Sequence, residues 1–566
     1  MTSLDWIVLS AAMVFIVVYG VWKGRGQRGL EAYLLSGRSA KWYTIALSIM
    51  ATQASAITFL STPGQAYDDG MRFVQMYLGL PIAMVILSIT AVPIFHRLKV
   101  YTAYEYLEGR FDLKTRSAAA LLFLTQRGLA AGLTIFAPAL ILSVILGWNL
   151  TYTNVAVGVM VVIYTTLGGT KAVSWTQFHQ MLVITLGMAV AFVTAIVLLP
   201  EGVGFLDAAR LSGSLGRLNA IDFSFDPANR YNIWSGVIGG LFLALSYFGT
   251  DQSQVQRYLT GSSIAQSRLA LLFNGLVKVP MQFLILLLGA MVFAFYQFSQ
   301  PPVFFNPVAV EQVRESPYGE RFDELEEAYA RAFDHKRAEA HDLLAAYDRG
   351  DDSLIAASRQ DLLDADAEMT QIKRRAVDLM VANDPQVDPS DTNFVFLTFV
   401  IDYLPAGLVG LLIAAILFAS MSSTSSELNA LASTTVVDVY KRWLRPDAGE
   451  QHYVVVSKLA TVFWGAYAIW FAEFASRLGT LVEAVNILGS IFYGTILGIF
   501  LMAFYSRRVG GTAVFVAAIF AELVVVWCFL ATDISFLWYN VIGCLLVILF
   551  SWTIHPLTRR RRPVAG

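Results

Sequence analysis

Charged residues and cysteines are both scarce in this sequence. Only 14% of the 566 residues are charged and 56% are hydrophobic, whereas a soluble globular chain carries roughly 25% charged residues. This composition excludes a soluble enzyme. The two cysteines, Cys528 and Cys544, lie within apolar stretches, so no disulfide framework is expected. The six histidines and two cysteines show no catalytic or metal-binding spacing, and nothing indicates a nucleic-acid partner.

Apolar stretches recur along nearly the whole chain, and each is long enough to cross a bilayer as a helix. The first stretch has no basic region before it, so we interpret it as a retained span and not as a signal peptide. The sequence predicts thirteen spans, at residues 4–22, 42–67, 73–95, 117–146, 153–168, 176–199, 233–250, 269–298, 404–440, 453–476, 483–505, 512–531 and 536–556.

The small net charge of −2 hides an uneven distribution. Residues 301–392 hold 21 acidic and 10 basic residues, and the remainder holds 21 acidic and 30 basic residues. Lysine and arginine gather in alternate short loops, which are expected to face the cytoplasm. The N-terminus is therefore predicted outside and the C-terminus inside a plasma (inner) membrane. Basic residues on the inner side include Lys23, Arg25, Arg28, Arg97, Lys99, Lys441, Arg442, Arg507, Arg508 and the run Arg559 to Arg562.

The acidic segment 301–392 is predicted to be a helical insertion on the outer side, because Glu, Ala, Leu and Arg dominate between Glu311 and Val381. Its simplest interpretation is a solvated cap, and the alternative is a regulatory or partner-binding role. No obligate protein partner is expected. We divide the chain into an extra span and loop (1–41), a core segment (42–300), the insertion (301–392), a second core segment (393–510) and two extra spans with a basic tail (511–566).

Two of the predicted spans have sequences that do not suit a regular helix in lipid. The second is rich in Ser, Thr and Gln and is closed by Pro63 and Gly64. The seventh contains four glycines and ends at Tyr247–Gln252. Counted after the first span, they are the first and sixth of ten helices, and interrupted helices at matching places indicate a transporter with an inverted repeat. Glycine packing between regular helices is the alternative.

The ninth span carries a cluster of hydroxyl groups between Ala419 and Glu427. Residues i, i+3 and i+4 share a helix face, so Ala419, Ser422 and Ser423 can present one carbonyl and two hydroxyls together. With carbonyls freed by a broken helix, they would form an oxygen cage suited to a hard monovalent cation. Plain hydrogen bonding between helices is the alternative.

Three blocks of sequence resemble the sodium/solute symporter family. They are Gly168–Gln180 after the fifth span, Thr250–Arg257 after the broken seventh span, and Met421–Tyr440 in the ninth. The segments Tyr101–Phe111 and Ala137–Ala139 are most similar to the branch that carries monocarboxylates, vitamins and iodide. The resemblance covers nearly the whole chain except residues 301–392.

The resemblance implies an all-α membrane protein with a leucine-transporter-type fold, in which two inverted five-helix repeats form the core. It also implies that inward sodium flux drives uptake of a small solute by alternating access. Carried over by position, the sodium ion would contact the carbonyls of Ala51, Ala54 and Ala419 and the hydroxyls of Ser422 and Ser423. Two-sodium members are similar in having an aspartate where this chain has Gln177, so one sodium per solute is expected.

The solute site implied by the resemblance differs from that of the sugar carriers. Tyr77 stands in place of their sugar-gripping glutamate, and Lys278 aligns with their lysine. Losing the carboxylate removes a strong acceptor for hydroxyl groups, so a small organic anion or zwitterion is favoured over a sugar. The implied solute contacts are Gln53, Thr58, Tyr77, Tyr247, Phe248, Lys278 and Asn486. A snorkelling role for Lys278 and a plain core role for the two aromatics remain open.

Ionisable residues inside spans are expected to be functional. Arg127 and Glu427 lie at similar depths, so we expect an ion pair between them, with Arg127 as an anion contact the alternative. Asp251 is expected to cap its helix or to pair near the cytoplasm. Proton coupling through Glu427 is a rival mechanism, a sugar symporter is a rival of the same fold, and a transporter-like sensor is the least favoured.

Overall fold

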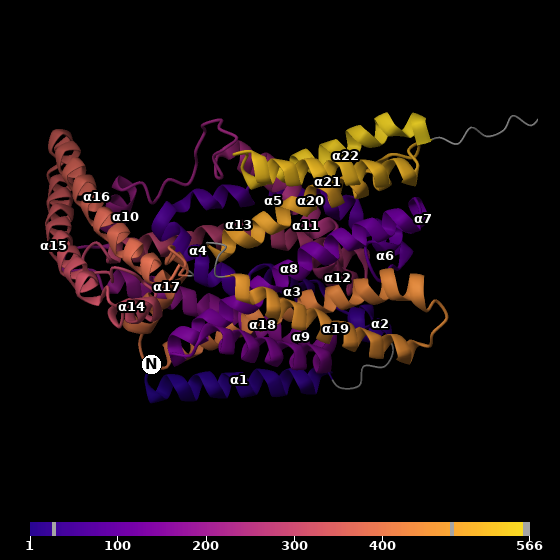
Figure 1. Ribbon diagram of the computed structural model, residues 1–566, viewed down its shortest axis with the longest axis horizontal. Coiled ribbons are helices and arrows are strands. Elements are labelled where there is room, and N and C mark those ends of the chain that lie inside the picture. The colour runs from indigo at the N-terminus through magenta and orange to yellow at the C-terminus, as the bar shows by residue number, and fades with distance from the viewer. Residues whose placement is uncertain (25–29, 386, 476–479, 559–566) are drawn as a thin grey trace, which may run out of the picture.

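The computed structural model describes residues 1–24, 30–385, 387–475 and 480–558, and all regular elements among them are helical. Arg25, Arg28 and the run Arg559 to Arg562, which entered the predicted orientation, lie outside these described residues. The helices, shown in Figure 1, are α1 (Ser3–Gly24), α2 (Leu30–Leu35), η1 (Ser36–Arg38), α3 (Trp42–Gln53), α4 (Ala56–Asp69), η2 (Met71–Tyr77), α5 (Leu80–Ile89), α6 (Ala91–Leu98), α7 (Glu105–Arg110), α8 (Leu113–Leu146), α9 (Leu150–Val197), α10 (Phe205–Ser214), η3 (Ser235–Gly239), α11 (Gly240–Gly249), α12 (Gln252–Leu259), α13 (Ile264–Phe295), α14 (Pro307–Arg314), α15 (Gly319–Arg349), α16 (Asp352–Asn383), α17 (Thr392–Tyr403), α18 (Leu408–Thr434), η4 (Thr435–Leu444), α19 (Glu450–Ala475), α20 (Leu481–Tyr505), α21 (Gly511–Ala531) and α22 (Phe536–Thr558).

The described residues contain nine helices that are long and apolar enough to cross a bilayer, or ten if the bent pair α3 and α4 counts as one span. The three remaining predicted spans correspond to shorter apolar helices, at Ser3–Phe15, Leu150–Thr166 and Ser235–Gly249. A further apolar helix, α17, precedes the ninth span, which begins at Leu408 and not at residue 404. The multi-pass architecture is confirmed, and the number thirteen stays a prediction.

The predicted spans 153–168 and 176–199 fall within a single helical element, α9. The expected loop between them is wrong, because the backbone of this intervening segment is helical. No proline occurs there, so Gly168 and Gly169 are the only strong helix breakers, and both are compatible with helix at a modest cost. The side chains of residues 167–176, which carry much of the first family-like block, lie outside the described part.

The expected interruption of the second span is confirmed. The axes of α3 and α4 differ by 56° across a break at Ala54 and Ser55, whereas Pro63 lies inside α4, which continues to Asp69. The Pro63 carbonyl instead approaches α13, where a Cβ on Gly289 would lie 2.1 Å from its oxygen. Gly289 thus permits close packing of α13 against α4.

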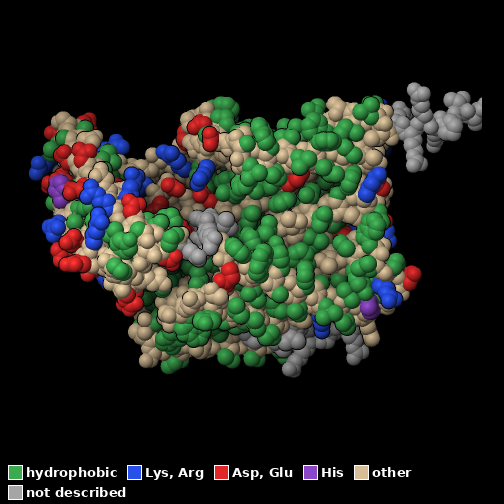
Figure 2. Space-filling model, in the orientation of Figure 1, with side chains coloured by type: hydrophobic (Ala, Val, Ile, Leu, Met, Phe, Trp, Pro, Cys, Tyr) green, Lys and Arg blue, Asp and Glu red, His purple; other side chains and the backbone are tan. Residues whose placement is uncertain are grey.

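The insertion is a helical unit at one end of the membrane bundle. Helices α15 and α16 lie side by side at the left of Figure 1, away from the long bundle helices. They share a small hydrophobic core with α14, which includes Phe322, Phe333 and Met380. Figure 2 shows charged side chains gathered over this unit, while hydrophobic side chains cover the visible side of the bundle.

Candidate functional site

Two interrupted helices place exposed backbone groups in the middle of the bundle. The first interruption separates α3 from α4, and the second, at Thr250 and Asp251, separates α11 from α12. Helix α18 packs against α3, α4 and α12, so its serine-rich face lies beside both breaks. Irregular backbone at membrane depth is tolerated only where it lines a cavity or is buried in protein, which marks this region as the candidate site.

Three of the five predicted sodium ligands, Ala51, Ala419 and Ser423, are joined by hydrogen bonds where α3 meets α18. The Ser423 hydroxyl lies 3.1 Å from the Ala51 carbonyl oxygen and 2.9 Å from that of Ala419, so its one proton is within donating distance of either carbonyl. The Ser422 hydroxyl is buried and has no hydrogen-bond partner among the described residues. No described residue donates a hydrogen bond to the Ala54 carbonyl. Uncompensated buried oxygens of this kind fit a bound cation.

A second polar cluster lies one turn away, around Gln177. The Ser48 hydroxyl donates to the Gln177 carbonyl oxygen at 2.6 Å. The Gln177 amide nitrogen lies 3.3 Å from the Thr52 hydroxyl and 3.4 Å from the Ser426 hydroxyl. The Gln177 amide therefore directs N–H groups toward the serine face of α18. An aspartate at this position would instead direct a negative charge toward that face.

Between the two broken helices lies a cavity of about 90 Å³. Five of the predicted solute contacts line it, namely Gln53, Thr58, Tyr77, Tyr247 and Asn486. The remaining lining residues are Thr52, Ser55, Ile57, Met76, Gln126, Arg127, Thr134, Leu243, Glu427, Val482, Val485 and Tyr493. A cavity this small is below the usual range for a small-molecule site.

Lys278 and Phe248 do not line the cavity. The Lys278 ammonium is fully buried, has no hydrogen-bond partner among the described residues, and lies 5.5 Å from the centre of the Tyr77 ring. Tyr77 therefore stands between Lys278 and the cavity, and the full burial does not fit the snorkelling alternative. Phe248 packs behind Tyr247, with the ring centres 4.9 Å apart.

A charged network forms one wall of the cavity. The predicted pair is confirmed: an Arg127 guanidinium nitrogen lies 3.0 Å from a Glu427 carboxylate oxygen. The same guanidinium also pairs with Asp251 and donates to the Tyr493 hydroxyl, and Thr134 donates to Glu427 at 3.0 Å.

Asp251 occupies the break between α11 and α12. It caps α12 by accepting from the Ser253 amide at 2.8 Å, and it also accepts from the Tyr493 hydroxyl at 2.8 Å. The expectation that Asp251 caps its helix is confirmed, but its pairing with Arg127 was missed. The position of Asp251 at a helix break was a signal for this role, whereas nothing local marked Tyr493.

Two broken helices, a crossing helix rich in serine, and a polar cavity between them define a membrane transporter built around an ion and solute site. The model of the sodium:solute symporter family matches residues 33–317 and 379–520. The chain therefore belongs to the sodium:solute symporter family, and it is a transporter, not an enzyme, as expected.

Known members of this family are similar over most of the chain. The sodium-coupled monocarboxylate transporter 1 of Xenopus laevis is 28% identical over 502 residues, which cover 88% of this chain and 67% of that protein. The sodium-dependent multivitamin transporter of Oryctolagus cuniculus is 26% identical and covers 88% of this chain and 66% of that protein. The human sodium/iodide cotransporter is 33% identical over 300 residues, covering 52% of this chain and 46% of that protein.

A solved structure confirms the expected fold class. A Na+-coupled sialic acid symporter in its substrate-bound outward-open state matches 99% of this chain and 98% of its own, with a TM-score of 0.76 at 21% identity. The all-helical, leucine-transporter-type architecture is thus shared along the chain.

Proposed function

We propose that this sodium-coupled symporter takes up a small organic anion, with a carboxylate as the group that the site recognises. The observation that carries this proposal is the buried ammonium of Lys278 behind Tyr77, which has no carboxylate partner among the described residues. The two charged groups that line the cavity, Arg127 and Glu427, pair with each other. Burying an ammonium without a counter-charge is costly, so an anion in the cavity would stabilise the charged form of Lys278.

The neutral polar groups on the cavity wall suit the oxygen atoms of such a solute. The amide groups of Gln53 and Asn486 and the hydroxyl of Thr58 provide hydrogen-bond donors without adding charge. A sugar would need acceptors for several hydroxyl groups, and the carboxylate of Glu427 is already held by Arg127 and Thr134. Relatives named for monocarboxylate transport support an organic anion, and a relative named for iodide transport supports a negatively charged solute.

The sodium ion is proposed to bind the carbonyls of Ala51, Ala54 and Ala419 and the hydroxyls of Ser422 and Ser423. In the described arrangement the Ser423 hydroxyl is within donating distance of two of these carbonyls. A sodium ion among the oxygens would turn that hydroxyl so that its lone pairs face the cation. A set of neutral oxygens suits a monovalent ion, which needs less charge compensation than a divalent one.

Coupling between ion and solute follows from the chain itself. Ala51 and Ala54 flank Gln53, so a sodium ion held between α3 and α18 fixes the part of the break that lines the cavity. Sodium binding would therefore favour the conformation in which the solute contacts are in place. By reciprocity, bound solute would strengthen sodium binding by the same factor.

One sodium ion per solute is proposed. A second cation beside Ser425 and Ser426 would meet the N–H groups of Gln177 and would find no negative charge to compensate it. Proton coupling is the second candidate mechanism, because Glu427 lines the cavity. Its engagement by Arg127 favours the sodium mechanism.

The chain is proposed to lie in the plasma membrane with its N-terminus and the insertion outside. Short loops rich in Lys and Arg support this orientation. Labelling of a cysteine introduced at the exposed residue Asp352 by a membrane-impermeant reagent tests it in intact cells, with a cysteine at the exposed residue Glu450 as the control for the opposite side.

Purified protein in proteoliposomes tests the solute and the coupling ion together. Propionate, lactate and benzoate represent organic anions, and glucose represents sugars. We expect an inward sodium gradient at equal pH to drive uptake of at least one anion and not of glucose. Glucose uptake would contradict the proposed solute class, and uptake driven by a proton gradient without sodium would contradict the sodium mechanism.

A further inference from the structure

A large pocket lies outside the central site, where the insertion meets the membrane bundle. Its volume is about 620 Å³, and α15 and α16 form one wall while the ends of α4, α13 and α17 form the other. The family match omits residues 318–378, so much of this wall belongs to the part of the chain that the family does not share. The lining residues are Tyr67, Asp68, Arg217, Phe293, Pro301, Phe305, Tyr329, Lys336, Asp366, Met369, Thr370, Lys373, Arg374, Val377, Asp378, Pro389, Ser390, Asp391 and Thr392. We call it the outer pocket.

Four basic and four acidic side chains line the outer pocket, but their charges are compensated unevenly. Lys336 pairs with Asp366 at 2.6 Å, and Lys373 pairs with Asp391 at 2.8 Å. Asp391 also accepts from the Phe305 amide at 2.8 Å. These two ion pairs hold α15 and α16 in place and leave no unpaired charge.

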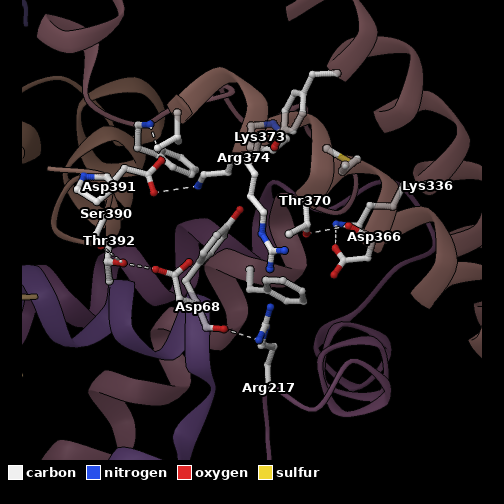
Figure 3. Close-up of a pocket in the computed structure, with 18 of the residues that line it drawn as sticks. Asp68, Arg217, Lys336, Asp366, Thr370, Lys373, Arg374, Ser390, Asp391 and Thr392 are labelled. Carbon is white, nitrogen blue, oxygen red and sulfur yellow. Dashed lines mark hydrogen bonds and ion pairs between the residues drawn. The ribbon is translucent and has the colours of Figure 1, made fainter. Parts of the chain in front are cut away.

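The other two basic residues, Arg217 and Arg374, have no carboxylate partner among the described residues. Arg217 donates to the Asp68 backbone carbonyl and lies 4.7 Å from the centre of the Phe293 ring, while its Nε is buried and has no hydrogen-bond partner in the part of the chain that the structure describes. Arg374 makes no hydrogen bond or ion pair within the described part of the chain, and Figure 3 shows its side chain pointing into the pocket toward Arg217.

Two guanidinium groups that point toward one another repel unless an anion lies between them. Neither of the two remaining carboxylates forms an ion pair with these arginines in the described part of the chain: Asp68 accepts from the Thr392 hydroxyl, as the dashed line in Figure 3 shows, and Asp378 is exposed, as Arg374 is. Guanidinium groups recognise a carboxylate by two parallel hydrogen bonds. Tyr67, Phe293, Phe305 and Tyr329 add aromatic surface for the organic part of a ligand.

We propose that the outer pocket is a second binding site for a small organic carboxylate, held between Arg217 and Arg374. The choice of a carboxylate rests on the proposed function, since a site at the outer mouth of a transporter meets the solute first. The outer pocket has none of the predicted sodium ligands, so its binding does not depend on sodium.

Equilibrium binding of radiolabelled benzoate to the full chain in nanodiscs tests the proposal, with and without sodium. Benzoate is the probe because it offers both a carboxylate and an aromatic ring. We expect a sodium-independent component in the wild type, and we expect Arg374→Met to weaken it at least tenfold. Arg375→Met is the matched control, because Arg375 is the exposed neighbour of Arg374 on α16 and does not line the pocket.

The outcomes separate this proposal from the proposed function. Ser423→Ala should remove the sodium-dependent component and leave the sodium-independent one. Absence of sodium-independent binding in the wild type, or equal binding by the Arg374 and Arg375 variants, would overturn the outer site while leaving sodium-driven uptake intact. Sodium-independent binding without any anion uptake would instead contradict the proposed function. Arg374 is exposed and makes no ion pair with any described residue, so its replacement is not expected to unfold the protein.

Discussion

Replacing Arg127 should destabilise the protein more than replacing either of its acidic partners. The Arg127 guanidinium serves two buried carboxylates, at 3.0 Å from Glu427 and in direct contact with Asp251. Arg127→Met would leave both carboxylates without a positive charge. Breaking a buried ion pair by removing one partner costs about 3–5 kcal/mol, so a loss of at least that size is expected.

Glu427→Gln should have a smaller effect, because Arg127 keeps Asp251 and the Tyr493 hydroxyl. Only a hydrogen bond to a charged group is lost, which contributes about 1.5–3 kcal/mol. In the double variant Asp251 is still unpaired, but Glu427 no longer adds a second charge. The double variant should therefore lose less stability than the sum of the two single variants, with a coupling energy of about 0.5–3 kcal/mol.

Thermal inactivation in detergent measures these differences, and half-lives at a fixed temperature avoid the assumption of reversible unfolding. Arg375→Met provides the control for loss of an exposed arginine. Equal losses for Arg127→Met and Glu427→Gln, or strict additivity in the double variant, would show that Arg127 does not hold the two carboxylates together.

Three further outcomes are expected. Ser423→Ala should reduce sodium-driven uptake at least tenfold with little loss of stability, because it removes a proposed sodium ligand. Ser457→Ala is the control for loss of a buried serine hydroxyl. If Ser423→Ala took up solute with the same apparent sodium affinity as this control, Ser423 would not be a sodium ligand. Gln177→Asp should raise the sodium-to-solute ratio from one toward two in coupled-flux titrations, since it supplies the missing charge; a wild-type ratio of two would refute the single-ion proposal. Burial raises the pKa of the Asp388 carboxyl to about 6 from an ordinary value of 3.8. The folded protein therefore holds the carboxyl proton more tightly than the unfolded chain, and the free energy of unfolding falls as the pH rises from about 4 through 6. Asp388→Asn should therefore raise the melting temperature at pH 8 and not at pH 4, and a gain of equal size at both values would show that titration of Asp388 is not the cause.

Hydropathy and short motifs were enough to predict the class of protein. Spans are a local property, because about 20 consecutive apolar residues cross the bilayer wherever they occur. The motifs around Thr250 and Met421 led to the family, and equal depth in two neighbouring spans led to the Arg127–Glu427 pair, which is confirmed. The same local reasoning failed between the fifth and sixth predicted spans, because glycines alone do not end a helix.

The sequence by itself thus determined the membrane class, the family and the helices that are interrupted. Only the tertiary structure decided that α3 and α4 separate at Ala54 and Ser55, and that the Pro63 carbonyl of α4 packs closely against Gly289 of α13. It also decided that Lys278 lies behind Tyr77, and that Arg374 of the insertion points toward Arg217 in the loop after α10. These relations join residues that are far apart in the chain, and their geometry depends on how the helices pack, which no local pattern specifies.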